Sequence, residues 1–412
     1  MKKTAHNKAN ETKNANATAR ATEKVIVDKK TPEEKKKETE REEVPKSGKA
    51  KLISILSAVV LALILIFKPE LLLGAINSVA TESADGVYAA FIDVGQGDSI
   101  FLRSPNGKTM LVDAGTPDSF ESIQNVLSEE GVTKLDVVVM THPHSDHMGS
   151  MKRVIDNYNI GTFYMPDAVN TTSSFDRMLS ALEKKKVKTK VIWGSAKTTI
   201  NWDGDVEVRV LSPIKGADYQ DNLNDMSVVI KVTYGETSFL FTGDAEYDAE
   251  HTVLDSGANL SATVLKVGHH GSDTSTCYPF LRAVSPQFAV ISVGTGNSYG
   301  HPDDGTLSKL RDAGVEVFRT DLQGDIFCTS DGKTVHFETQ RQSNPEQVNP
   351  TIADGSGQES VDHGGTYIGN LNSLKFHRTS CSSLPEESNR IYFDSRSAAV
   401  DSGYEPCKRC NP

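Results

Sequence analysis

Short runs of β-branched and aromatic residues, closed by Gly, Asp or Asn, dominate the chain between residues 87 and 338. Two stretches with apolar residues at helical spacing, Ser119–Glu130 and Thr306–Ala313, lie among them. The clearest strand-like runs are 88–94, 99–104, 108–115, 135–142, 206–213, 227–235, 237–244, 262–269 and 288–294. Runs of this kind are typical of strands, so the pattern predicts one mixed α/β domain over residues 87–338.

The first 51 residues have a different pattern, with no aromatic residue and mostly Lys, Glu, Thr, Ala and Asn. Such a segment buries too little apolar surface to offset the entropy lost on ordering. We therefore predict that residues 1–51 are a disordered tail. It carries 15 basic and 9 acidic side chains, and this mixture favours a solvated tail over a segment that binds lipid or nucleic acid.

A run without charges, Leu52–Phe67, follows the tail, and after the interruption Lys68-Pro69-Glu70 a second apolar stretch, 71–76, could extend it. It has no polar face, which favours a membrane anchor (52–76) over a buried core helix. Lysines precede the run and acids follow it, so the positive-inside rule places residues 87–338 outside the cytoplasm. A cleavage site at Ser78-Val79-Ala80, and hence a secreted protein, is the alternative.

The composition of the chain argues against several classes of protein. Five cysteines in 412 residues exclude a disulfide-dense scaffold. Beyond residue 51 the chain has 29 basic and 46 acidic side chains, which argues against a broad phosphate-binding surface. A single long apolar run excludes a polytopic channel.

The densest chemistry follows the apolar run 135–140, where three imidazoles and a carboxylate occur within six residues: His142, His144, Asp146 and His147. Burying this set without a shared cation would be costly, and N/O donors of this kind suit Zn²⁺ and related divalent ions. We predict that His142 and His144 hold one ion, while Asp146 and His147 face a second.

An HxHxDH motif after a hydrophobic strand resembles the signature of the metallo-β-lactamase fold. The resemblance narrows to the hydrolase domain of ComEC-type competence proteins, because further motifs occur in order. These are FIDVGQGDS (91–99), LVDAG (111–115), FTGD (241–244), LKVGHHGS (265–272) and NSYGHP (297–302). The resemblance implies an αββα sandwich with two metal ions at one edge of its sheets.

The resemblance also implies residue roles. Asp244 should bridge the two ions, and His269 or His270 should complete the second site. Many members of the fold supply a third imidazole to the first ion, but this chain has no histidine between His147 and His251. Asn224 or Asp225 is expected to substitute, and an oxygen donor there makes Mn²⁺ as plausible as Zn²⁺.

Other polar residues of these motifs have candidate roles. Asp98 could ligate a metal or position the nucleophile, or it could be a turn carboxylate. Asp113 is expected to orient ligand imidazoles. His301 is a candidate general acid or phosphate contact, and Asn297 and Tyr299 are candidate substrate-binding residues.

The chain ends in a second module. Residues 339–365 are polar and rich in Gly, Ser, Pro and Gln, which predicts a flexible linker. In residues 366–412, one imidazole and three thiolates form a Cys3His set that predicts a structural zinc: His377, Cys381, Cys407 and Cys410. A disulfide is the alternative, but it would leave one of these thiols unpaired. Cys277 and Cys328 are expected to be packed side chains.

The spacing FHxxxC…GYxPCxxCxP resembles the metal-binding domain of the Ada DNA-repair protein. Methyl transfer in that family uses four cysteines, whereas His377 takes one position here. Nucleic-acid binding by this module is compatible with the resemblance.

Together these patterns predict a membrane-anchored dinuclear metallo-hydrolase that cleaves phosphodiesters, with DNA or RNA as the expected substrate. A phosphodiesterase acting on teichoic acid or another small phosphoester is the first alternative. An inactive nucleic-acid-binding protein is the second. No protein partner is deducible from the sequence.

Overall fold

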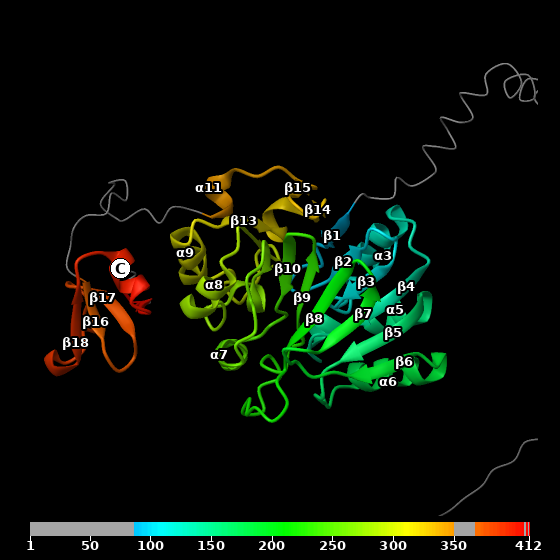
Figure 1. Cartoon of the computed structure of the whole chain (residues 1–412), viewed down its shortest axis with the longest axis horizontal. Coiled ribbons are helices and arrows are strands. Elements are labelled where there is room, and N and C mark those ends of the chain that lie inside the picture. Colours follow the sequence, from blue (N-terminus) through cyan, green and yellow to red (C-terminus); the bar gives the residue numbers. More distant parts are fainter. Residues whose placement is uncertain (1–85, 350–366, 408, 411) are drawn as a thin grey trace, which may run out of the picture. The chain divides into compact units, whose positions relative to one another are not determined.

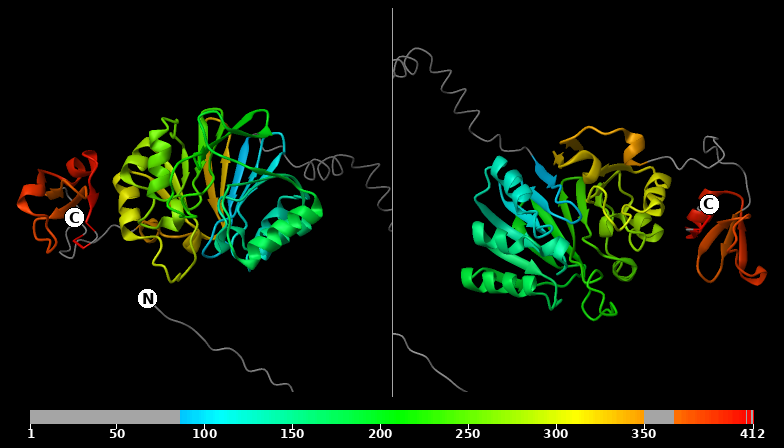
Figure 2. Two further views of the ribbon diagram at one scale, coloured as in Figure 1. Left: turned by 90° about the horizontal axis from the view of Figure 1, so that it is seen from below. Right: turned by 180° about the vertical axis from the view of Figure 1, so that it is seen from behind.

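The computed structural model describes residues 86–349, 367–407, 409, 410 and 412. The body, which precedes residue 350, has two β-sheets packed face to face with helices on both outer sides (Figure 1; Figure 2, left). It is therefore an α/β sandwich of αββα type, as the motifs imply. The predicted tail (1–51) and anchor (52–76) lie outside the described residues. Among the described helices, none is long and apolar enough to cross a membrane.

The first sheet has the order β15-β14-β1-β2-β3-β4-β5-β6. Its strands are β1 (Val87–Phe91), β2 (Ile100–Arg103), β3 (Thr109–Val112), β4 (Lys134–Val139), β5 (Asn159–Met165), β6 (Lys188–Val191), β14 (Ile326–Ser330) and β15 (Val335–Thr339). Strands β3 to β6 are parallel to one another. Their carboxyl ends therefore meet at one edge of the sheet.

The second sheet has the order β13-β12-β11-β10-β9-β8-β7. Its strands are β7 (Thr199–Asp203), β8 (Val206–Ser212), β9 (Val229–Tyr234), β10 (Thr237–Phe241), β11 (Val264–Lys266), β12 (Phe288–Ile291) and β13 (Glu316–Arg319). Strands β10 to β13 are parallel. Loops after β3, β4, β10, β11 and β12 carry the motif residues, so parallel pairing brings distant motifs to the carboxyl ends of the strands.

Three buried layers hold the sandwich together. Between the sheets, residues of both pack together, such as Phe91 and Phe241 with ring centroids 6.0 Å apart. The outer layer of the first sheet is covered by α3 (Phe120–Glu129), α5 (Met151–Asn157) and α6 (Ser173–Lys185). That of the second is covered by α7 (Tyr247–Asp255), α8 (Tyr278–Val284) and α9 (Asp304–Asp312). Apolar burial on both faces explains why the central strands read as continuous apolar runs.

The body extends past the predicted boundary at residue 338. Thr339 closes β15, and the short helix α11 (Pro345–Val348) follows within the predicted linker. Val348 is only 4% exposed and packs in the outer core of the second sheet, and Arg319 donates a hydrogen bond to its carbonyl. One well-placed valine is enough to dock this polar segment, which composition does not reveal. The rest of the predicted linker, from residue 350, lies outside the described residues.

Shorter elements complete the two parts. The body also contains α4 (Ser145–Met148), the 3₁₀ turn η1 (Gly268–Gly271) and α10 (Thr320–Gln323). The C-terminal module has a sheet of order β18-β16-β17-β19. Its elements are β16 (Tyr367–Asn370), β17 (Lys375–Arg378), η2 (Glu387–Asn389), β18 (Arg390–Phe393), α12 (Arg396–Asp401) and β19 (Glu405–Pro406). Its core is small, centred on Phe376, Phe393, Ala399 and Tyr404.

Candidate metal centre

Asp113, directly after β3, organises the start of the site. Its carboxylate accepts hydrogen bonds from the Thr141 backbone N–H and hydroxyl, both at 2.7 Å, and lies 2.8 Å from Nδ1 of His147. All three residues are buried. Because Nδ1 is taken, His147 turns its Nε2 towards the interior of the site. Asp113 therefore holds an imidazole in place, in the position expected from its motif.

Four side chains from three segments converge on one point: Asp146 and His147 of α4, Asp244 after β10, and His270 of η1. One ligand atom from each lies within 4.8 Å of all the others. Nε2 of His147 is 3.1 Å from Oδ1 of Asp244. Nε2 of His270 is 3.4 Å from Asp146 and 3.5 Å from Oδ2 of Asp244. Of the two neighbouring histidines, His270 is thus the one that joins this cluster.

His142 and His144 form the other half of the site. Nε2 of His142 lies 3.0 Å from Nδ1 of His144 and 3.8 Å from Oδ2 of Asp244. Asp244 therefore stands between the two imidazole groups, as a bridging carboxylate would. The glycine before it, Gly243 (φ +53°), lies so close to Thr141 that a Cβ would meet that side chain at 2.8 Å.

Asn224 and Asp225, the two residues expected to replace the missing imidazole, have different surroundings in the structure. Asp225 accepts hydrogen bonds from the backbone N–H groups of Glu246 and Ala249 and from the Asn222 amide, so its carboxylate is used to anchor the start of α7. Asn224 is different: its side-chain oxygen is buried and makes no hydrogen bond within the described residues. Of the two predicted candidates, Asn224 is therefore the one whose side-chain oxygen is available as a metal ligand.

Glu246 is a site residue that the motifs did not single out. It accepts hydrogen bonds from the amides of Asn222 and Asn224 and lies 2.8 Å from Nδ1 of His269. His269 is thereby held with Nε2 3.9 Å from Asp244, at the margin of the cluster. The only sequence signal for this role is the position of Glu246, two residues after Asp244.

Asp98 is buried beside His270, and its carboxylate also lies within 4.8 Å of ligand atoms of Asp113 and His147. Its carboxylate forms a 2.8 Å ion pair with Lys266, whose side chain is fully buried in β11, and lies 3.4 Å from Nδ1 of His270. The same Nδ1 hydrogen-bonds the Ser292 carbonyl at 2.9 Å. Asp98 and Lys266 thus act on the placement of His270. A lysine inside an apolar strand was the available sequence signal, and it was missed.

The loop after β12 lies beside the cluster. Asn297 accepts hydrogen bonds from the backbone of Tyr299 and His301 and donates to two carbonyls, so its side chain shapes the loop and has no group left for substrate. The His301 ring lies 5.5 Å from that of His269 and stacks on Tyr299 at 5.8 Å. Tyr299 is 71% exposed. The rings thus extend from the cluster to solvent.

The buried carboxylates of the site favour the binding of cations. Burial by itself would raise the pKa of Asp244, but His147 and His270 outweigh it and hold that pKa well below its usual value. Burial would lower the pKa of His270, yet Asp244, Asp146 and Asp98 raise it to about 10. Burial, with help from His269 and His270, lowers the pKa of His301 and so favours its neutral form.

The donor set fits divalent cations. His147 Nε2, His270 Nε2, Asp244 Oδ1 and Asn224 Oδ1 are all buried and lack hydrogen bonds within the described residues. Buried polar atoms of this kind are normally satisfied, and imidazole and carboxylate donors suit Zn²⁺ or Mn²⁺. These atoms therefore point to cations that the chain is built to hold.

The C-terminal module contains a separate donor set. His377, Cys381, Cys407 and Cys410 each place a ligand atom within 4.8 Å of the others. Nδ1 of His377 is 3.4 Å from the Cys381 sulfur, and the Arg378 N–H points at the Cys410 sulfur at 3.4 Å. Three thiols and one imidazole at this spacing suit a closed zinc site. Cys277 and Cys328 are buried free thiols in the body.

These features define the class of protein. Residues 92–295 match the Metallo-beta-lactamase superfamily, and residues 360–412 match the Metal binding domain of Ada. The chain thus contains a metallo-β-lactamase-fold hydrolase domain followed by an Ada-type zinc-binding domain.

The hydrolase domain is similar to bacterial proteins that include a competence protein and a recombination protein. It is 30% identical over 252 residues to ComE operon protein 3 of Bacillus subtilis, covering 57% of this chain and 32% of that protein. It is 33% identical over 236 residues to competence protein ComA of Neisseria gonorrhoeae, covering 57% and 31%. Recombination protein 2 of Haemophilus influenzae is 29% identical over 240 residues, covering 57% and 28%. The chain spans about a third of the length of these relatives.

Solved structures resemble the chain more distantly. The metallo-β-lactamase fold protein YhfI from Bacillus subtilis is 14% identical with a TM-score of 0.37, covering 56% of this chain and 96% of that one. Zn²⁺-bound PqqB from Methylobacterium extorquens is 12% identical with a TM-score of 0.38, covering 56% and 97%.

Proposed function

We propose that residues 86–349 form a dinuclear metal-dependent phosphodiesterase that cleaves nucleic acid. The observation that carries the proposal is the convergence of Asp146, His147, Asp244 and His270 beside the His142–His144 pair. Asp244 reaches towards both groups, which is the arrangement a pair of bridged cations needs. When bound, two such ions would lower the pKa of a water and offset charge on a phosphate.

The chain's own residues would orient the phosphate. His301 lies half-buried beside the cluster, and burial lowers its pKa, so it suits a hydrogen bond to a phosphate oxygen better than the proton donation expected of a general acid. Glu246 keeps His269 in one orientation, with Nε2 turned to the cluster. Asp113 and the Asp98–Lys266 pair hold the imidazoles of His147 and His270.

Nucleic acid is the favoured substrate for two reasons. The relatives of the domain are described as competence and recombination proteins. In addition, Tyr299 exposes an aromatic ring next to His301, and a base can stack on such a ring whatever its sequence. A small phosphoester such as teichoic acid offers no base for this contact.

Metal content and turnover test the catalytic part of the proposal. Asp146→Ala should lose metal and reduce cleavage of bis(p-nitrophenyl) phosphate by orders of magnitude, because a negatively charged ligand is removed. His301→Ala should keep its metal and lose about 10²–10³-fold in kcat, as expected for one hydrogen bond made to the developing charge. His336→Ala, at an exposed histidine of β15, is the control. Full activity of Asp146→Ala would end the two-metal proposal.

A substrate panel tests the nucleic-acid part. Single-stranded DNA, RNA and plasmid DNA are compared with choline teichoate at equal metal loading. Tyr299→Ala should raise KM for oligonucleotides and leave KM for bis(p-nitrophenyl) phosphate unchanged. Efficient cleavage of teichoate with none of nucleic acid would replace the proposal by its small-phosphoester alternative. Metal binding without turnover of any phosphodiester would favour an inactive binding protein.

A further inference from the structure

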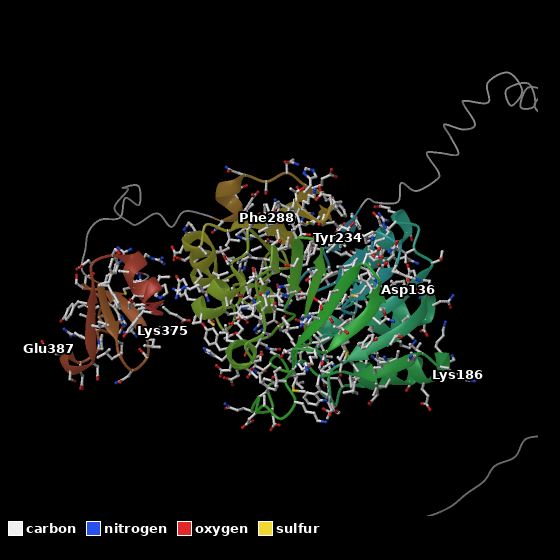
Figure 3. All side chains as sticks on the ribbon, in the orientation of Figure 1. Asp136, Lys186, Tyr234, Phe288, Lys375 and Glu387 are labelled. Carbon is white, nitrogen blue, oxygen red and sulfur yellow. The ribbon has the colours of Figure 1, made fainter. Side chains whose placement is uncertain are left out.

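A concentrated basic segment stands out from the acidic body. Residues 87–338 contain 21 Lys and Arg against 34 Asp and Glu, yet five of those 21 fall within seven consecutive residues. We call this segment the lysine strand; it consists of Lys184, Lys185, Lys186, Lys188 and Lys190 at the end of α6 and in β6. It lies at the rim of the body, where Lys186 is labelled (Figure 3).

Two residues of the lysine strand, Lys188 and Lys190, lie on an open edge of the first sheet. β6 is the last strand in the sheet order, and all five lysines are exposed. Lys185 donates a hydrogen bond to the Asp156 carbonyl, and the Lys190 ammonium lies 5.3 Å from the centroid of the Tyr164 ring. Within the described residues, Lys184, Lys186 and Lys188 have no ion-pair partner. Their charge is therefore available to an external ligand.

Strand register shows that the lysine strand leads towards the metal cluster. Lys190 pairs with Tyr164 of β5, and Tyr164 pairs with Val139 of β4. His142 follows Val139 by three residues. Two strand spacings of about 4.8 Å and three residues at about 3.3 Å put Lys190 on the order of 14 Å from His142.

The side of the sheet to which the lysine side chains point also agrees with a path towards the metal cluster. Paired residues in neighbouring strands point to the same side of a sheet, and Tyr164 packs in the core between the two sheets. Lys190, and Lys188 two residues before it, therefore point to the inner side of the open edge, while Thr189 and Val191 point outwards. Along the axis of a duplex each phosphate of one strand advances by about 3.4 Å, so one backbone can place phosphates both at Lys190 and at the cluster.

We propose that the lysine strand binds the sugar–phosphate backbone of the polynucleotide whose scissile bond lies at the metal cluster. This inference rests on the proposed function and adds how the strand reaches the site. Lys188 and Lys190 follow the edge towards the carboxyl end of β6, the end of the parallel strands at which the metal ligands lie. A linear polyanion fits this edge, whereas a membrane surface needs a broad basic face, and the rest of the body is acidic.

The experiment compares two triple variants of the full, metal-loaded chain. Lys184, Lys188 and Lys190→Gln removes charge from the lysine strand. Lys108, Lys134 and Lys333→Gln removes the same charge from exposed lysines elsewhere; Lys108 precedes β3 and Lys134 begins β4, away from the carboxyl ends of those strands. Binding of a single-stranded oligodeoxynucleotide is measured by fluorescence anisotropy over a salt series, together with turnover of bis(p-nitrophenyl) phosphate.

The lysine-strand variant should bind the oligonucleotide at least about tenfold more weakly, and its log–log salt slope should fall by about 2, since each phosphate contact on a single strand contributes about 0.7. Its turnover of bis(p-nitrophenyl) phosphate and the binding by the control variant should stay near wild type. An unchanged slope, or an equal loss in the control, would overturn the inference.

Two further outcomes separate the inference from the proposed function. Oligonucleotide binding through the lysine strand with no cleavage of any nucleic acid would sustain the inference and reject the nuclease. Lysine-dependent binding to vesicles of phosphatidylglycerol, without binding to the oligonucleotide, would overturn the inference in favour of a lipid surface.

Discussion

At the residue scale, buried charges that touch no substrate set the geometry of the metal ligands. Asp113 fixes His147, and Asp98 with Lys266 stands behind His270. Partners behind metal-ligating histidines commonly change affinity by 10–100-fold when they are removed. Lys266, which pairs with the Asp98 carboxylate behind His270, is therefore the residue outside the cluster whose replacement tests this role most directly.

Lys266→Met should destabilise the protein by about 3–5 kcal/mol, because it leaves the buried Asp98 carboxylate unpaired. It should also weaken metal binding at the His270 side by about 10–100-fold. Chemical denaturation and metal titration measure the two effects. The double variant Lys266→Met with Asp98→Asn removes both charges and should recover much of the stability. A single variant as stable as wild type would show that the pair is not needed.

The affinity of the site for metal should increase with pH. The pKa of His270 is raised to about 10 and that of His147 is also raised, and both imidazoles must lose a proton to bind a cation. Metal affinity should therefore increase with pH from 6.5 to about 10, with protons released into the buffer. In the metal-free protein, the stability that protonated His270 contributes is present below pH 6.5 and is lost as pH rises through about 10. Calorimetry in buffers of different ionisation enthalpy measures the release.

At the element scale, tight turns bring the strand ends together. The backbone N–H of Asp98 hydrogen-bonds the Asp146 carbonyl at 3.1 Å, which joins the turn after β1 to the start of α4. Gly97 lies in this turn, and a Cβ there would be 2.3 Å from that same carbonyl oxygen. The approach between two motifs far apart in the chain thus requires a residue without a side chain.

Gly97→Ala should therefore cost about 1–3 kcal/mol of stability, the usual range for overpacking, and should reduce metal occupancy at the Asp146 side. Thermal denaturation and metal content give the two readouts. Gly204→Ala is the matched control, because no atom lies within 4 Å of its Cβ position, and it should stay within about 0.5 kcal/mol of wild type. Equal effects in the two variants would contradict the close approach at Gly97.

At the scale of the whole molecule, the body and the C-terminal module have separate metal sites of different chemistry. The module has a small apolar core, so its fold should depend on zinc. In the full chain, Cys407→Ser should lower the zinc content by one equivalent and leave phosphodiester turnover near wild type. Cys328→Ala, at a buried thiol in the body, should lose no zinc. Full zinc content in Cys407→Ser would refute the Cys3His site.

Membrane topology is a second prediction at this scale, and it comes from the sequence of residues 52–76 alone. Protease added to intact cells should digest the body and spare the tail, since lysines precede the apolar run. Immunoblotting with tags at both ends distinguishes the fragments. A body that is protected until the cells are lysed would contradict the orientation, and a body released into the medium would favour cleavage after residue 80.

Much of this protein is determined by local sequence. The HxHxDH cluster, the TGD turn, the paired histidines and the Cys3His spacing identify the fold and the donor types, because ligands close in sequence need only one strand end or turn to present them. The predicted strands 88–94, 99–104, 108–115 and 135–142 correspond to β1 to β4 within a few residues at each end.

Only the tertiary structure decides which of these donors meet. His270 joins the cluster while its neighbour His269 pairs with Glu246, although both residues have the same left-handed backbone conformation within η1. Asn224 keeps a free oxygen, whereas Asp225 anchors α7. The partnership of Asp98 with Lys266 crosses 168 positions of the chain. These choices depend on the pairing of strands from separate parts of the sequence, and a local pattern carries no information about which buried charge will neutralise another.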